Sequence, residues 1–323
     1  MYRVTAALFA LVLLAAQGIA APPRRQPPPQ VPMFGSSQDI LRWINGYRAA
    51  PDPSKLPMAV QAMSRLALFK DLDAAGVYVG FTAGVLGANP DRAEKLVAGM
   101  FPMPPEDQVV IVRAIAYSGL PNWKELLTQF VERMPARKVL IEHYLFGKGQ
   151  TLLKLPLDST PAALDTLWGY YFATGSFEHV GRILTVLPWA KDQNNVEKLT
   201  LGSMAKWTLA NNALQDKDLL DYLKRELNTR PKEVATPLRE VIEAAETFET
   251  SRIRKEAMGA IEELKRKGPA DGRQFAWWGM AGQTALALGC IVVGALGHPE
   301  VGLPCVIGGA VSGAALKLMA PAQ

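Results

Sequence analysis

The sequence predicts an all-α protein: an irregular helical-hairpin repeat array or bundle, followed by a long helix and a C-terminal apolar helical hairpin. Apolar residues recur at three- and four-residue spacing from Ser37 to Gly268, and no sustained alternation of apolar and polar residues marks a strand. Two long apolar stretches close the chain. With 323 residues, of which 49% are hydrophobic, the chain is long and apolar enough to bury a sizeable core.

Residues 1–20 have the three-part pattern of a secretory signal peptide. Arg3 precedes an uncharged apolar stretch, and Gly18 and Ala20 put small residues at positions −3 and −1 of a cut after Ala20. The apolar run also approaches the roughly 17 residues that can span a bilayer, so an uncleaved signal anchor is the alternative. Both interpretations predict an exported protein of the bacterial envelope whose body lies in the periplasm.

Residues 21–36 form a predicted linker. Six prolines lie between positions 22 and 32, a composition that favours an extended, semi-rigid spacer. The net charge of the whole chain is +5. Because this excess is mild and spread along the chain, no nucleic-acid partner is predicted, whereas attraction to anionic lipid headgroups is compatible with it.

Residues 37–230 are predicted to form about ten to twelve helices joined by short loops. Plausible helix starts are residues of the capping type, and plausible stops are glycines or prolines. The predicted starts are Ser37, Asn122, Thr160 followed by Pro161, and Ser176, and the predicted glycine stops are Gly87, Gly119, Gly147 and Gly175.

A weak internal repeat runs through this region. An aromatic-rich helix, a glycine turn, an amphipathic helix and a proline stop recur around Gly87, Gly119 and Gly175. The first two glycines are 32 residues apart, close to the period of about 34 residues in tetratricopeptide repeats, and the next interval of 56 residues breaks the register.

The segment Leu167-Trp168-Gly169, with Tyr171, resembles the Leu-Gly and Tyr positions of tetratricopeptide repeats, although the later Ala and Phe positions of that family are not matched. The resemblance covers about 100 residues. It implies a right-handed stack of helix pairs with a concave face that binds a protein partner. An irregular helical bundle is the alternative.

No residues stand out as a catalytic, cofactor or metal site. The three histidines, His143, His179 and His298, lack the spacing of zinc ligands. Ser203 and Lys206 have the Ser-x-x-Lys spacing of penicillin-recognising serine enzymes, but the companion motifs of that family are missing. We therefore expect Ser203 and Lys206 to be an exposed helical pair.

Four aromatic residues are candidates for a binding face: Trp168, Tyr171, Trp189 and Trp207. Such rings can line a groove for a peptide or a glycan, but at helical spacing they can equally form core. The sequence leaves these alternatives open.

Residues 231–268 are predicted to form one long amphipathic helix. An apolar stripe includes Leu238, Val241, Phe248 and Ile253, and charged residues crowd the other faces. At 1.5 Å per residue, the part from Pro237 onward would be a rod of roughly 45 Å.

Residues 273–320 are predicted to form an apolar helical hairpin that crosses a membrane. Residues 275–297 carry no charge over 23 positions, which is long enough to span a bilayer as a helix. His298-Pro299-Glu300 interrupts the apolar sequence before a second apolar run. The alternative is a hairpin buried within a soluble core. The basic residues before the hairpin favour this alternative, because they would lie on the outer side of the membrane, whereas basic residues usually flank a membrane helix on its inner side.

The only two cysteines, Cys290 and Cys305, lie on either side of this turn. An antiparallel hairpin brings them to the same level, and export supplies an oxidising compartment, so a disulfide is one interpretation. Two buried free thiols are the other.

Two function classes follow from the sequence. In the first, the protein is a non-catalytic envelope scaffold or interaction protein, which the C-terminal hairpin tethers to membrane lipid or assembles into a homo-oligomer. In the second, it is an envelope enzyme or cell-wall-polymer binder that uses an aromatic groove.

Overall fold

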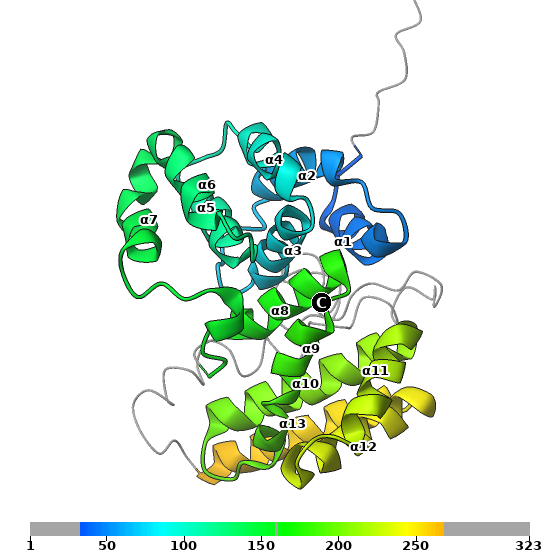
Figure 1. The fold of residues 1–323 in the computed structure, drawn as a ribbon. Coiled ribbons are helices and arrows are strands. Elements are labelled where there is room, and N and C mark those ends of the chain that lie inside the picture. Colours follow the sequence, from blue (N-terminus) through cyan, green and yellow to red (C-terminus); the bar gives the residue numbers. More distant parts are fainter. Residues whose placement is uncertain (1–32, 159–160, 268–323) are drawn as a thin grey trace, which may run out of the picture. The chain divides into compact units, whose positions relative to one another are not determined.

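A computed structural model of the chain describes residues 33–158 and 161–267 (Figure 1). Within these ranges the protein contains thirteen α-helices, several short 3-10 segments and no strand, so the all-α prediction is confirmed there. The helices are α1 (Ser37–Gly46), α2 (Leu56–Arg65), α3 (Gly76–Gly87), α4 (Ala93–Gly99), α5 (Gln108–Tyr117), α6 (Trp123–Gln129), α7 (Lys138–Leu145), α8 (Pro161–Thr174), α9 (Phe177–Leu184), α10 (Val196–Gln215), α11 (Lys217–Leu227), α12 (Lys232–Glu246) and α13 (Thr250–Lys267).

The predicted signal peptide, most of the linker, and the C-terminal hairpin with Cys290 and Cys305 lie outside these ranges. The last linker residues are described, and they belong to the folded body. Phe34 is buried, and its ring lies 5.2 Å from that of Trp43, centroid to centroid. Within the described ranges, every helix is too short or too polar to cross a membrane.

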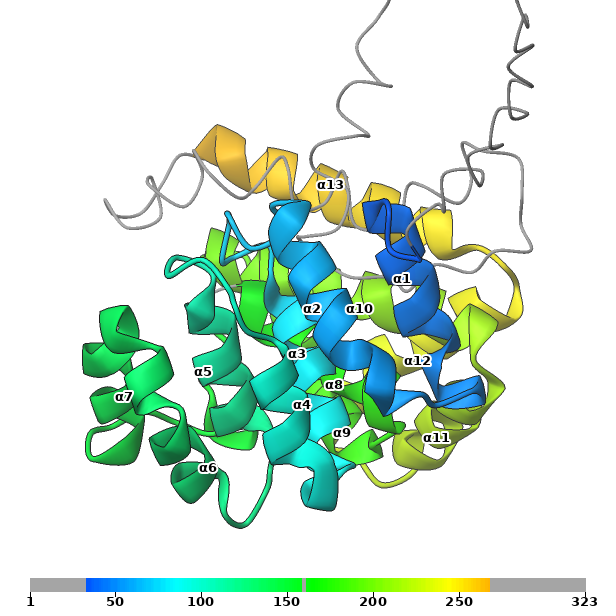
Figure 2. The ribbon, with the colours of Figure 1, turned by 90° about the horizontal axis from the view of Figure 1, so that it is seen from above.

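Helices α3 and α8 make the most extensive helix–helix contact in the described body (Figures 1 and 2). Helix α3 is buried on every side from Gly76 to Leu86. Its glycines at positions 76, 80 and 84 recur every fourth residue and face α8, where Gly169 faces α3 in return. A Cβ atom built on Gly80 would lie 1.9 Å from the carbonyl oxygen of Thr166. The missing side chains therefore let the two backbones touch.

Helix α3 makes its main contact with a helix that lies far from it in the sequence. It packs chiefly on α8 and much less on α4, which follows it directly.

Two of the predicted helix stops have the expected backbone geometry. Gly119 follows the end of α5 with φ +73°, and Gly175 follows the end of α8 with φ +71°. Both lie in the left-handed region, where a residue without a side chain is favoured. These stops are fixed by local sequence.

The first helix begins one residue earlier than predicted. Ser36, not Ser37, is the N-cap of α1, and it forms a capping box with Asp39. The Asp39 amide donates to the Ser36 hydroxyl at 3.2 Å, and the Ser36 amide donates to the Asp39 carboxylate at 3.0 Å. Asn122 and Ser176 are N-caps of α6 and α9, but neither side chain bonds to a helix amide.

The prediction of one long helix over residues 231–268 is wrong. The chain turns between α12 and α13 at Thr247–Glu249, where Phe248 adopts φ +59° and exposes its side chain instead of continuing the apolar stripe. The turn lets both helices pack against α10, with Leu238 and Val241 of α12 and Ile253 of α13 buried. One straight helix could bury only part of its apolar stripe against α10. Packing against α10 therefore favours two helices joined by a turn over one continuous helix.

Candidate functional site

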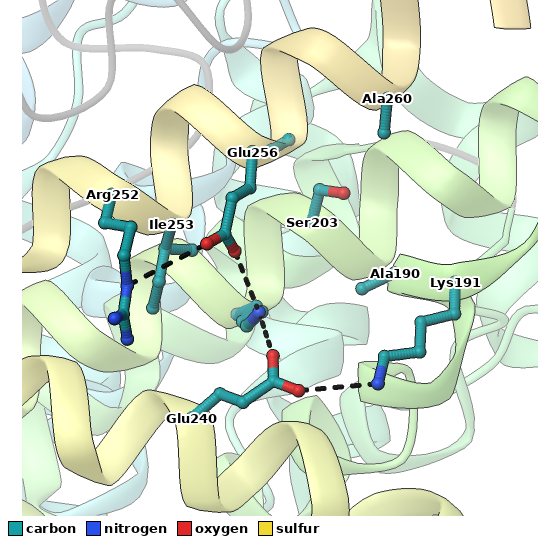
Figure 3. A pocket seen from close by; sticks show the side chains of 10 residues that line it. Ala190, Lys191, Ser203, Glu240, Arg252, Ile253, Glu256 and Ala260 are labelled. Atoms are coloured by element: carbon teal, nitrogen blue, oxygen red, sulfur yellow. Dashed lines mark hydrogen bonds and ion pairs between the residues drawn. The ribbon is translucent and has the colours of Figure 1, made fainter. Parts of the chain in front are cut away.

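A cavity of about 410 Å³ lies where α10, α12, α13 and the 3-10 segment η7 (Leu187–Lys191) meet (Figure 3). Its size is within the range of small-molecule sites. The polar residues that line it come from all four elements: Lys191, Ser203, Lys206, Glu240, Arg252 and Glu256.

Local sequence on α10 explains how these elements come together. Asn195 caps the helix by accepting a hydrogen bond from the Lys198 amide at 2.9 Å. Gly202 then leaves room for η7, because a Cβ atom there would lie 2.2 Å from the Ala190 nitrogen. Ser203 and Lys206 follow at a spacing of three residues, so they share one helix face beside η7.

The ammonium group of Lys206 is the centre of an ion-pair cluster. It donates to one carboxylate oxygen of Glu240 and lies 3.8 Å from an oxygen of Glu256. The second oxygen of Glu240 lies 3.4 Å from Lys191 Nζ, and Arg252 Nε lies 3.8 Å from Glu256 (Figure 3). Three cations and two carboxylates therefore neutralise most of one another's charge within the cavity.

The surroundings of Glu240 hold it in the ionised form. Burial by itself raises the pKa of this carboxyl, but the hydrogen bond and charge of Lys206, with the charge of Lys191, outweigh burial and lower the pKa below its usual value. Glu240 is therefore a carboxylate at neutral pH, and it pairs with both Lys191 and Lys206.

The prediction that Ser203 and Lys206 form an exposed pair is wrong, since both residues are buried. In penicillin-recognising enzymes the amine lies next to the serine hydroxyl. Here the Lys206 ammonium contacts two carboxylates from α12 and α13 instead. The arrangement joins α10 to α12 and α13.

A second cavity, of about 440 Å³, lies beside the ends of α8 and α11, and Arg48 lines it. The Arg48 guanidinium donates to Asp216 and lies 4.6 Å from the centre of the Tyr171 ring. The Tyr171 hydroxyl donates to the same Asp216 carboxylate at 2.7 Å. Asp216 also caps α11 by accepting from the Leu219 amide at 3.2 Å.

Burial alone would raise the pKa of Asp216, but the hydrogen bond from Tyr171 and the charge of Arg48 lower it below its usual value. Burial, followed by the hydrogen bond to Asp216, raises the pKa of the Tyr171 hydroxyl. Asp216 is therefore a carboxylate at neutral pH, and this cluster ties the segment after α1 to α8 and α11.

The four predicted aromatic candidates do not share an open face. Trp168, Tyr171 and Trp207 are 0%, 1% and 4% exposed, and only Trp189, on η7, is half-buried. Trp168 packs edge-on against Tyr171 and donates from Nε1 to Thr208 at 3.0 Å. The three buried rings therefore belong to the core.

The two described histidines have different surroundings. His143 is exposed on α7. His179 is buried, stacks on Tyr170 at 3.9 Å between ring centres, and has Nδ1 at 2.9 Å from the Ser176 hydroxyl. Burial lowers the pKa of His179 to about 4. No group of three or more His, Cys, Asp or Glu within residues 33–158 and 161–267 is arranged to hold a metal ion.

We expect His179 to make the protein less stable as the pH falls. Its folded pKa of about 4 is below the unfolded value of about 6.5, so the unfolded chain takes up the proton first between these pH values. Between pH 7 and pH 5 the free energy of unfolding should fall by about 2 kcal/mol from this residue. Urea unfolding of the wild type and His179→Phe, which keeps a stacked ring without titration, measures this difference.

His143→Phe is the matched control, because it makes the same replacement at an exposed histidine. An equal fall in stability for the wild type and His179→Phe would show that folding does not lower the pKa of His179.

Sequence reasoning missed the partners of Lys206. Glu240 and Glu256 are ordinary charged residues in the segment predicted as one long amphipathic helix, and no motif connects them with α10. A usable signal was the position of Lys206 itself, because it lies in the middle of a largely apolar helical stretch and must find a counter-ion if that stretch is buried.

Comparison with protein-family profiles, curated proteins and solved structures found no match to this chain.

Proposed function

We propose that this chain is an exported, non-catalytic interaction protein of the bacterial envelope, whose helical body binds a protein partner and whose C-terminal hairpin tethers it to a membrane. The charge pairing around Lys206 is the observation that supports the proposal that the protein is non-catalytic. Lys206 contacts carboxylates of α12 and α13, so the Ser203–Lys206 pair, the most enzyme-like pair in the sequence, belongs to a cluster that ties three helices together.

Sequence features support the location. The signal-peptide pattern of residues 1–20 directs the chain out of the cytoplasm, and the proline-rich part of the linker, residues 22–32, spaces the body from that end. The uncharged stretch of residues 275–297 is long enough to span a bilayer.

The proposed body contains repeat-like helix pairs that are assembled as a bundle. The pairs α5–α6 and α8–α9 each begin with a helix that stops at a glycine with positive φ. Helices of each pair pack on one another, and α3 with α8 joins the pairs at the centre. Such a body offers outer helix faces to a partner, while Trp168, Tyr171 and Trp207 are used in the core.

Deleting residues 273–323 should move the protein from the membrane fraction to the soluble fraction, because these residues hold the long uncharged stretch. Cell fractionation followed by a carbonate wash measures the change. Full-length protein that remains in the soluble fraction would contradict the tether.

The folding of the truncated protein separates a membrane tether from a hairpin that belongs to the core. The truncated protein should keep its helical circular dichroism and a cooperative unfolding transition. If truncation abolishes that transition, the hairpin belongs to the core of the body, which is the alternative that the sequence leaves open.

A further inference from the structure

Helix α7 exposes two large apolar side chains that do not pack against the rest of the protein. Large apolar side chains that are exposed in the described residues are few, and the two most exposed are Val139 at 82% and Phe146 at 84%. Val139 is the second residue of α7, and Phe146 is its C-cap. Both side chains are exposed, one near each end of the helix, and we call the side of α7 between them its outer stripe.

The opposite side of α7 packs against the rest of the body. Ile141 and Tyr144 are buried, and the Tyr144 hydroxyl lies 2.9 Å from the Tyr117 hydroxyl of α5. Val139 and Phe146 are therefore not needed to hold α7 in place. Both views of the fold show α7 at the edge of the helical body, where its outer side is accessible (Figures 1 and 2).

The segment that contains α7 is basic. Residues 132–154 contain five basic and two acidic residues, a net charge of +3. Lys124 donates to the carbonyl of Leu145 at 3.1 Å, which places an ammonium beside Phe146, and Lys148 is exposed two residues further on. The acidic residue within the stripe, Glu142, has Lys138 3.9 Å away.

We propose that the outer face of α7, formed by Val139 and Phe146 with Lys124 and Lys148, is a contact site for an anionic lipid surface. Apolar side chains rimmed by basic residues suit the boundary between headgroups and acyl chains, where aromatic and aliphatic groups enter and ammonium groups meet phosphates. The acidic residue on this face, Glu142, has Lys138 beside it, so the exposed apolar surface with its basic rim fits this partner in charge. The contact does not depend on the C-terminal hairpin.

A local depth measurement in the full chain tests the proposal. A nitroxide is attached at Val139→Cys, with Cys290→Ser and Cys305→Ser to remove the native thiols. The chain is mixed with vesicles of phosphatidylcholine alone or with added phosphatidylglycerol. On the anionic vesicles the nitroxide should gain collisions with oxygen and lose collisions with a water-soluble nickel chelate. Adding Lys124→Glu and Lys148→Glu should abolish this change.

Phe248→Cys in the same background is the matched control, because Phe248 is also exposed, at 77%, but lies in the turn between α12 and α13. Its nitroxide should stay accessible to the nickel chelate. The contrary result is a chain that floats with the vesicles while the nitroxide at residue 139 stays as accessible to the nickel chelate as that at residue 248. It would overturn the lipid contact and make a protein partner for α7 the better explanation.

Flotation separates this contact from the proposed tether. Flotation with anionic vesicles only, with residue 139 buried, supports the α7 contact and contradicts the hairpin tether. Flotation with both vesicle types and burial of residue 139 on the anionic ones supports both. A chain that floats with neither vesicle type overturns both.

Discussion

Replacing Gly80 by Ala should destabilise the protein by about 3 kcal/mol or more, the upper range for overpacking a core. The new Cβ atom would lie 1.9 Å from the Thr166 carbonyl oxygen, and this neighbour is backbone that cannot rotate away. The usual helical advantage of Ala over Gly, up to about 1 kcal/mol, is too small to offset the clash. Urea unfolding followed by circular dichroism measures the loss.

Gly169→Ala, on the partner helix, should have a similar effect, because its Cβ atom would lie 2.1 Å from the Val77 carbonyl oxygen. Gly46→Ala is the matched control. Gly46 ends α1 with φ −83°, and a Cβ atom there would have no neighbouring atom within 4 Å, so the change should be neutral or stabilise by up to about 1 kcal/mol. Equal midpoints for Gly80→Ala and Gly46→Ala would rule out the close α3–α8 contact.

Replacing Trp168 by Ala should cost about 3 to 5 kcal/mol, the usual range for removing a fully buried large aromatic side chain. The ring is 0% exposed, stacks on Phe172 with centroids 5.7 Å apart, and bonds to Thr208. Its removal leaves a large cavity at the centre of α8. The midpoint of urea unfolding, compared with that of the wild type, gives the size of the effect.

Trp189→Ala is the comparison within the same predicted aromatic group. Because Trp189 is only half-buried at η7, we expect its removal to cost about 1 kcal/mol. A small effect for Trp168→Ala would mean that this ring faces solvent and is available to a partner.

Local sequence was sufficient to predict the helices and several of their ends. The recurrence of apolar residues every three or four positions identified the all-α class, and Gly119 and Gly175 marked stops that have positive φ. These features depend on the conformational preferences of a few neighbouring residues, so they can be inferred without knowing the partners of a helix.

The candidate site was less accessible to sequence reasoning. Ser203 and Lys206 were recognised as a motif, but their burial and the partners of Lys206 were not predicted. Glu240 and Glu256 reach the ammonium only because α12 and α13 both fold back on α10. The aromatic residues were identified as a group, whereas their division between core and surface depends on which helices cover them.

By itself, the sequence determined that the described body is helical and that Gly119 and Gly175 end two of its helices. Only the tertiary structure decided that the long helix breaks at Phe248, that the glycines of α3 meet α8, and that Lys206 is neutralised by Glu240. The physical reason is that helix formation is governed by hydrogen bonds and rotamers within a few residues. The face that a helix buries, and the charge that it pairs, are set by segments distant in the chain.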